Sequence, residues 1–316
     1  MRLIFAGTPS AAVPTLQTLL DSSHEVAAVL TRPPARSGRG RSLHPSAVGA
    51  AAADRGLIPI EASDLRGEDT REALRRVGAD LGVVVAYGAL IPPAVLEMPR
   101  LGWINLHFSD LPRWRGAAPV QWAIREGDAT TASCVFQLEA GLDTGPVFSR
   151  LPVDIGHEDA GELLMRMAEL GAHQVLEVVD ALAAGTACAR PQEQVGVTRA
   201  RRLTSADGFT DFCAPAEVVD ALVRSVTPDP GAWTTLPDGQ RLKLGVLRAT
   251  QHPTPGPGVV VARRHDVEVG CTRGTVTLGR VAPAGRSWMD ADAWGRGARL
   301  GEGSRLGGAM TEEGMH

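Results

Sequence analysis

Short apolar runs alternate with amphipathic stretches along the first part of the chain. The runs predict buried strands near residues 2–5, 24–31, 57–60, 81–86, 103–106 and 133–138. Helices are expected between most of them, the first with Thr8 as its N-cap and Pro9 at its first helical position. A long helix is predicted over 159–184, with an inner face formed by Leu163, Met167, Leu170 and Val178. This alternation predicts an α/β fold with a mainly parallel sheet.

The pattern changes beyond residue 188. Residues 189–206 lack a clear period and are predicted to be a linker between two domains, 1–188 and 207–300. After the linker one helix is predicted over 214–226, followed by short strands near 240–247, 258–262, 267–271 and 275–281. Short strands separated by turns indicate a small barrel or sandwich. The Gly-rich, polar stretch 301–316 is expected to be frayed.

Composition narrows the class of protein. With 316 residues, of which 44% are hydrophobic and 22% charged, the chain can bury the cores of two domains. It shows no spanning apolar stretch and no cleavable leader pattern, so we expect a cytoplasmic monomer without membrane association. The four cysteines form no Cys-x-x-Cys pair, so neither a disulfide framework nor a metal site is expected. Because the net charge is -4, any contact with nucleic acid needs a local basic patch.

Two common functions of such a sheet find little support. The turn after the first strand lacks Gly-x-Gly-x-x-Gly, and no acidic residue ends the second strand, which argues against a nicotinamide-dependent dehydrogenase. No Gly-Lys-Ser or Gly-Lys-Thr occurs in the chain. Phosphoryl transfer through a P-loop is therefore not expected.

Residues 103–112 run from an apolar strand into a polar loop. Asn105 and His107 are two positions apart, so in a strand both can point into one cleft beyond the carboxyl end of the sheet. An amide and an imidazole there can hydrogen-bond a carbonyl oxygen as it becomes an oxyanion, which suits acyl transfer. Asp143, in the glycine-flanked turn 141–145, could orient His107, favour its protonated form and help remove a proton from an attacking amine.

Each of these residues also has an ordinary explanation. A lone histidine is more often a surface or satisfied core residue, and an asparagine near a strand end is commonly a turn former. An aspartate between glycines is frequent in turns. Spacing alone therefore leaves the function open.

A wider set of motifs resembles one enzyme family. The first group is Asn105-Leu106-His107 with Ser109 and Leu111-Pro112, then Arg115-Gly116-Ala117-Ala118-Pro119 and Gly141-Leu142-Asp143-Thr144-Gly145. Further matches are Phe5-Ala6-Gly7-Thr8-Pro9, Val85-Ala86-Tyr87-Gly88, Pro228-Asp229-Pro230-Gly231-Ala232-Trp233 and Pro283-Ala284-Gly285. Together they span nearly the whole chain and closely resemble the folate-dependent formyltransferases, most of all the members that act on initiator tRNA. The resemblance implies a Rossmann-like formyl-transfer domain followed by an OB-like barrel, with 10-formyltetrahydrofolate as donor and methionyl initiator tRNA as acceptor.

The resemblance also assigns roles to single residues. It implies that Asn105 and His107 stabilise the tetrahedral intermediate and that Asp143 handles protons together with His107. The family's folate-contacting Ser-Leu-Leu-Pro loop corresponds to Ser109, Asp110, Leu111 and Pro112. Asp110 stands where the family has leucine. We expect its carboxylate to turn outward, because burying an unpaired carboxylate costs several kcal/mol.

Residues 32–45 hold four arginines and no acidic residue. Proline and glycine keep this segment irregular, and guanidinium groups can bind phosphates or base edges, so it could order on a tRNA acceptor stem. Composition alone favours a solvated basic loop instead. In the family a similar insertion enters the acceptor stem, which implies tRNA contacts for Arg36, Arg39 and Arg41, with Arg39 contributing most.

Two other functions stay open. One is a formyltransferase for a small amine such as an aminosugar nucleotide, against which the arginine segment argues. The other is a catalytically weak tRNA-binding protein, suggested by Asp110 in the folate loop. The presence of Asn105, His107 and Asp143 together argues against that second alternative.

Overall fold

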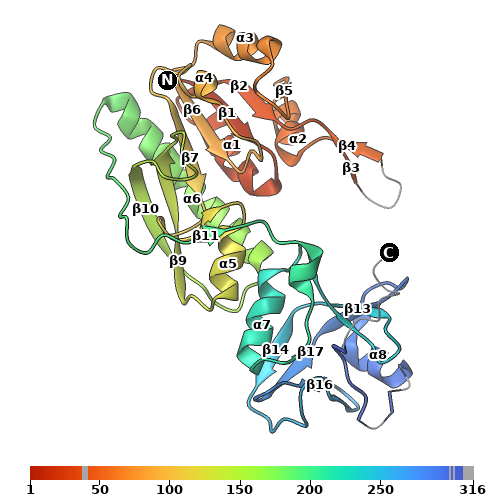
Figure 1. Cartoon of the computed structure of the whole chain (residues 1–316). Coiled ribbons are helices and arrows are strands. Elements are labelled where there is room, and N and C mark those ends of the chain that lie inside the picture. Colours follow the sequence, from red (N-terminus) through yellow and green to blue (C-terminus); the bar gives the residue numbers. More distant parts are fainter. Residues whose placement is uncertain (38–41, 299, 302, 309–316) are drawn as a thin grey trace. The chain divides into compact units, whose positions relative to one another are not determined.

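The computed structural model describes residues 1–37, 42–298, 300–301 and 303–308 (Figure 1). Contacts between Cα atoms divide the chain into two units. The first unit comprises Met1–Pro119, Thr130–Asp154 and Leu164–Ala200, and the second comprises Val120–Ala129, Ile155–Leu163 and Arg201–His316.

A seven-stranded sheet forms the centre of the first unit, in the order β10-β9-β7-β6-β1-β2-β5. Its strands are β1 (Arg2–Gly7), β2 (Glu25–Thr31), β5 (Ile60–Glu61), β6 (Leu81–Val85), β7 (Trp103–His107), β9 (Thr130–Gln137) and β10 (Val147–Asp154). Strands β7, β6, β1, β2 and β5 pair in parallel, whereas β9 and β10 are antiparallel to their neighbours. The predicted Rossmann-like, mainly parallel sheet is confirmed.

The helices of this unit are α1 (Val13–Leu20), α2 (Ala47–Asp54), α3 (Glu68–Val77), α4 (Pro93–Leu96) and most of α6 (Ala160–Ala184). Local chemistry sets their ends. In α3, acidic residues occupy the first turn and arginines the last, which complements the helix dipole, and Gly78 ends the helix in the left-handed conformation. Helix α6 lies close on the sheet, because a Cβ added at Gly171 would be 2.7 Å from Leu106 Cδ2.

Several predicted details of the first unit are wrong. Thr8 does not cap a helix: its hydroxyl donates to the Tyr87 carbonyl, a 3-10 helix (Ser10–Ala12) follows, and α1 begins only at Val13. Leu170 is not on the inner face of α6 but 42% exposed. Strand β5 retains only the last residue of the predicted strand 57–60, and β10, a half-exposed edge strand, is absent from the predicted elements.

The second unit holds two four-stranded sheets and helix α7 (Ala216–Ser225). One sheet has the order β12 (Ala232–Thr235), β13 (Arg241–Leu244), β18 (Arg280–Pro283), β19 (Met289–Asp290). The other has the order β14 (Leu247–Thr250), β17 (Thr275–Leu278), β16 (Val267–Gly270), β15 (Val260–Ala262). All neighbours are antiparallel, and their inner faces share one apolar core with α7 and α8 (Ala291–Gly297). A second domain of short antiparallel strands was the expected class, and it is confirmed.

Segments expected to be irregular carry some structure. Within residues 189–206, β11 (Arg199–Ala200) pairs with β8 (Arg115–Gly116), and a 3-10 helix covers Ser205–Gly208. In the stretch expected to be frayed, Leu306 is only 2% exposed and its amide donates to the Gly258 carbonyl. The remaining short helix, α5, covers Pro119–Arg125. Within the described ranges, no helix has the length and apolar content needed to cross a membrane.

Candidate active site

Strand β7 brings Asn105 and His107 to one face of the sheet. It lies between β6 and β9, so that Asn105 is paired with Val84 on one side and Phe136 on the other. His107 closes the strand and is only 6% exposed. The Oδ1 atom of Asn105 is buried and has no hydrogen-bond partner among the described residues. A buried acceptor in that state costs about 1–3 kcal/mol, so this amide is prepared for a partner that the folded chain itself does not supply.

The ring of His107 is fixed from two sides. Its Nε2 atom lies 3.1 Å from the Trp114 carbonyl oxygen, and its edge meets the Phe136 ring at 89° with centroids 6.2 Å apart. A carbonyl only accepts, so Nε2 carries a hydrogen and donates it. The other ring nitrogen, Nδ1, is therefore the one that can exchange a proton with a substrate.

Asp143 approaches that second nitrogen. Its Oδ2 atom lies 3.9 Å from His107 Nδ1, an ion-pair distance that is too long for a hydrogen bond. The same oxygen accepts a 2.7 Å hydrogen bond from the Gly116 amide, and the residue is 8% exposed. The carboxylate is thus held by the backbone and still faces the imidazole.

The turn that carries Asp143 is strained and needs its glycines. Asp143 has φ 53°, a left-handed conformation that costs an L-residue on the order of 1–2 kcal/mol. A Cβ at Gly145 would lie 1.9 Å from the Gln137 carbonyl oxygen, and one at Gly141 would lie 2.3 Å from Thr144 Oγ1. Gly145 of the Gly-Leu-Asp-Thr-Gly motif is therefore required by backbone packing, and Gly141 by the side chain of Thr144.

The loop after β7 carries the predicted folate-binding residues. Ser109 is completely buried, and its hydroxyl donates to the Arg113 carbonyl at 2.6 Å, so its contribution is to the shape of the loop. The carboxylate of Asp110 was expected to turn outward, but it is partly exposed and paired with an arginine. Its two carboxylate oxygens accept hydrogen bonds from Arg150, the Nη2 contact being 2.6 Å long, and this pairing raises the pKa of the Arg150 guanidinium.

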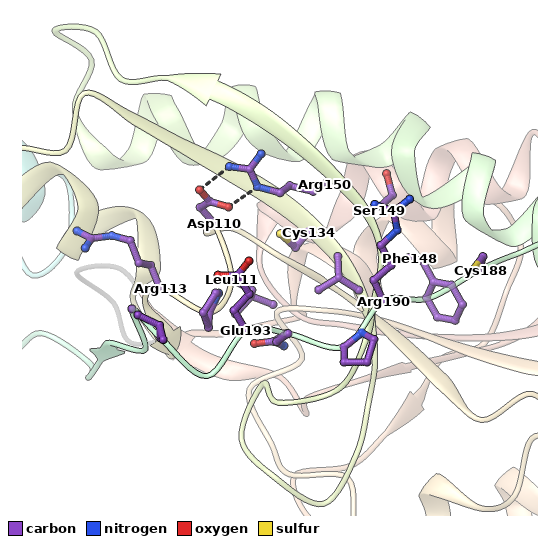
Figure 2. A pocket seen from close by; sticks show the side chains of 16 residues that line it. Asp110, Leu111, Arg113, Cys134, Phe148, Ser149, Arg150, Cys188, Arg190 and Glu193 are labelled. Atoms are coloured by element: carbon purple, nitrogen blue, oxygen red, sulfur yellow. Dashed lines mark hydrogen bonds and ion pairs between the residues drawn. The ribbon is translucent and has the colours of Figure 1, made fainter.

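Asp110, Leu111 and Pro112 line a cavity of about 700 Å³ (Figure 2). Its other walls are β9 and β10 around Cys134 and Phe148, together with Cys188, residues 190–193, Val195 and Gly196. The volume falls in the range of small-molecule sites, and apolar side chains alternate with charged ones on its walls. Burial raises the pKa of the Cys134 thiol to about 12, so this thiol is protonated at neutral pH.

The structure describes one of the three arginines that are predicted to contact tRNA. Arg36 lies in the hairpin formed by β3 (Ala35–Ser37) and β4 (Ser42–His44), paired with Leu43, and is exposed. Arg39 and Arg41 lie outside the described residues.

Other residues at the site are missing from the sequence prediction. Thr198 Oγ1 accepts a 2.8 Å hydrogen bond from the amide of Trp114. The carbonyl of the same Trp114 accepts from His107. Gln192 donates to the backbone of the Asp143 turn. Both come from the segment predicted to be a linker, and no periodicity marks them.

Among the described residues, no cluster of three or more His, Cys, Asp or Glu is arranged to hold a metal ion.

Comparison with known sequences defines the class. The formyl transferase domain matches residues 1–179, and the formyl transferase C-terminal domain matches residues 202–299. The chain belongs to the formyl transferase family, as the motifs predicted. It is similar to the methionyl-tRNA formyltransferase of Acidothermus cellulolyticus, with 50% identity over 324 residues, covering 97% of this chain and 100% of that protein. The methionyl-tRNA formyltransferase of Thermobifida fusca is 47% identical over 309 residues, covering 97% of this chain and 99% of that one.

Solved structures share the fold at low sequence identity. HypX from Aquifex aeolicus in complex with tetrahydrofolic acid has a TM-score of 0.68 and 18% identity, over 95% of this chain and 48% of that one, so the chain spans about half of HypX. WlaRD, a sugar 3N-formyl transferase, has a TM-score of 0.67 and 14% identity, over 91% and 99% of the two chains. The methionyl-tRNA formyltransferase from Clostridium thermocellum has a TM-score of 0.56 and 18% identity, over 80% and 94%.

Proposed function

We propose that this enzyme transfers the formyl group of 10-formyltetrahydrofolate to the α-amine of methionyl initiator tRNA, for the initiation of translation. The observation that carries the chemistry is the convergence of His107 Nδ1 on Asp143 Oδ2 at 3.9 Å, with Asn105 on the same face of β7. The choice of acceptor is supported by relatives of that name that match the chain over nearly its whole length. As a translation enzyme it would act in the cytoplasm, and we propose that it does so as a monomer.

The geometry suggests a role for each group. The amine attacks the formyl carbon and forms a tetrahedral intermediate whose oxygen carries negative charge. Hydrogens on Asn105 Nδ2 and on His107 Nδ1 would donate to that oxyanion. The buried Oδ1 of Asn105 would accept an N–H of the incoming amine. Asp143 would stabilise the imidazolium and help move the amine proton toward the leaving nitrogen as the carbon–nitrogen bond to tetrahydrofolate breaks.

The cavity beside the 109–112 loop is the proposed donor site. Leu111, Pro112 and Phe148 supply an apolar wall for an aromatic ring, and Arg190 supplies charge for carboxylates. Asp110 and Glu193 are the acidic members of the lining. The pairing of Asp110 with Arg150 keeps that carboxylate from being an unpaired charge next to the donor.

The exposed hairpin around Arg36 is the proposed tRNA contact in this unit, together with Arg39 and Arg41. Guanidinium groups bind phosphates by forked hydrogen bonds, which requires that the arginine be accessible. Arg36 meets that requirement. For the whole chain we propose a formyl-transfer domain of 1–188, a linker of 189–206 and a second domain of 207–300.

One assay tests the proposal against its rivals. Methionyl initiator tRNA, methionyl elongator tRNA and an aminosugar nucleotide are each incubated with the enzyme and 10-formyltetrahydrofolate, and the formylated product is measured. We expect product mainly on initiator tRNA, and none without the donor. Product mainly on the aminosugar would assign the enzyme to small amines, and no product on any acceptor would leave only a binding function.

A further inference from the structure

The segment between the two family domains is fixed to the first unit at both ends. At one end, Arg190 and Val147 exchange backbone hydrogen bonds of 2.9 and 2.8 Å. At the other, the Arg115 amide donates to the Thr198 carbonyl at 3.0 Å, and Ala200 pairs with Gly116. A Cβ at Gly116 would lie 2.5 Å from the Ala200 carbonyl oxygen, so the two backbones are in close contact. Residues 190–200 therefore cross this unit as a bound strap.

Gln192 lies in the middle of the strap, and its side-chain amide is fully used. Its Nε2 atom donates to the carbonyls of Asp143 and Gly145, both at 2.8 Å. Its Oε1 atom accepts from Arg115, at 3.1 Å from Nε and 2.6 Å from Nη2. Carbonyls only accept and a guanidinium only donates, so these partners fix which end of the amide is which.

These bonds close a ring around the proposed proton-handling carboxylate. Gly116 donates its amide to Asp143 Oδ2, its neighbour Arg115 holds Gln192, and Gln192 holds the Asp143 carbonyl. Asp143 has a left-handed backbone that its neighbours must maintain. The side chain is thus held through β8, and the main chain through Gln192.

We infer that Gln192 is a positioning residue for catalysis: by clamping the backbone of the Asp143 turn, it keeps the carboxylate aimed at His107. This inference rests on the proposed function. A small displacement of a catalytic group lowers turnover strongly, and the proposed tRNA contact lies on another surface. Loss of Gln192 should therefore lower kcat and leave KM for tRNA nearly unchanged, whereas KM for the donor does not test the inference, because Gln192 also lines the proposed donor cavity.

The test replaces Gln192→Leu, which removes every hydrogen bond of the amide at similar size. We expect kcat for formylation at saturating donor to fall about ten- to hundredfold, with KM for tRNA changing by less than about twofold. The exposed Gln194 of the same segment gives the matched control, Gln194→Leu, which should behave as the unmodified enzyme. Gln192→Glu provides a second variant, because it keeps the Arg115 contact and loses both donors to the turn; it should reproduce the loss in kcat.

An Asp143→Asn background separates positioning from general support of the fold. If Gln192 acts through Asp143, adding Gln192→Leu to Asp143→Asn should lower kcat by less than about twofold further. The same ten- to hundredfold loss in both backgrounds would overturn the inference, and so would normal turnover in Gln192→Leu and Gln192→Glu. An unmodified enzyme without formyl transfer would instead refute the proposed function, which distinguishes the two failures.

Discussion

The reacting groups and the hairpin around Arg36 lie in the same unit but differ in how exposed and how tightly held their side chains are. His107 and Asp143 are each less than a tenth exposed, and the main chain of Trp114 and Gly116 holds their side chains. Arg36, Ala35 and the residues of β4 are exposed, and the described part of this hairpin has three cross-strand pairs. Chemistry needs charges already in place when the substrate arrives. Recognition of a phosphate backbone needs accessible cations whose partners come with the substrate.

The largest effect that this comparison predicts comes from Asn105→Ala. The substitution removes an oxyanion donor from the preorganised site, so kcat should fall roughly 10²- to 10³-fold. Because the Oδ1 of Asn105 is buried without a partner among the described residues, its removal should leave the fold at least as stable as before. Steady-state kinetics together with a thermal melt measures both. Near-normal turnover would remove Asn105 from the mechanism.

A smaller loss is expected from Thr198→Val, which keeps the shape of the side chain and removes its hydroxyl. The Trp114 amide then loses its 2.8 Å acceptor, and the carbonyl of Trp114 is the group that orients His107. We expect kcat to fall about five- to tenfold, the scale of one hydrogen bond. Thr186→Val, at an exposed position after α6, is the control. Equal kcat in both variants would mean that His107 does not depend on this support.

Arg36→Ala tests the other side of the comparison. The change should raise KM for tRNA severalfold and leave kcat unchanged, because an exposed cation contributes to binding and not to the geometry of the reacting groups. The salt dependence of kcat/KM should weaken by about one unit of slope, as expected for one lost phosphate contact. A fall in kcat at saturating tRNA would contradict the separation of the two regions.

The elements that the sequence predicts well are those with local signals. Strand β7 and the shared face of Asn105 and His107 follow from a period of two within five residues. Edge strand β10 was missed because its half-exposed positions give no such pattern. The prediction of Thr8 as an N-cap is wrong because its hydroxyl donates to a partner far away in the sequence, the Tyr87 carbonyl.

The supporting residues of the site could not have been found this way. Gln192 lies 49 positions from Asp143, and Thr198 lies 84 positions from Trp114. Their partners at Trp114 and in the Asp143 turn are main-chain atoms, which every residue type carries, so no pairing of residue types points to these contacts. Their segment also lacks the apolar spacing of a helix or strand, although it is bound to β8 and β10.

The smallest effect is expected at Asp110, the position where this chain departs from the leucine of the family. Asp110 is 33% exposed and Arg150 51% exposed, and an ion pair of this kind is worth about 0–1 kcal/mol. Asp110→Leu should therefore change the donor KM by less than about twofold and leave kcat unchanged.

Arg150→Leu is the more sensitive variant of this ion pair. It leaves the Asp110 carboxylate unpaired on the cavity wall, so it should raise the donor KM more than Asp110→Leu does. In the double variant Asp110→Leu with Arg150→Leu, the donor KM should return toward that of the unmodified enzyme, because both charges are gone. A large fall in donor KM for Asp110→Leu alone would mean that the carboxylate opposes the donor despite its arginine, and that the departure from leucine weakens donor binding.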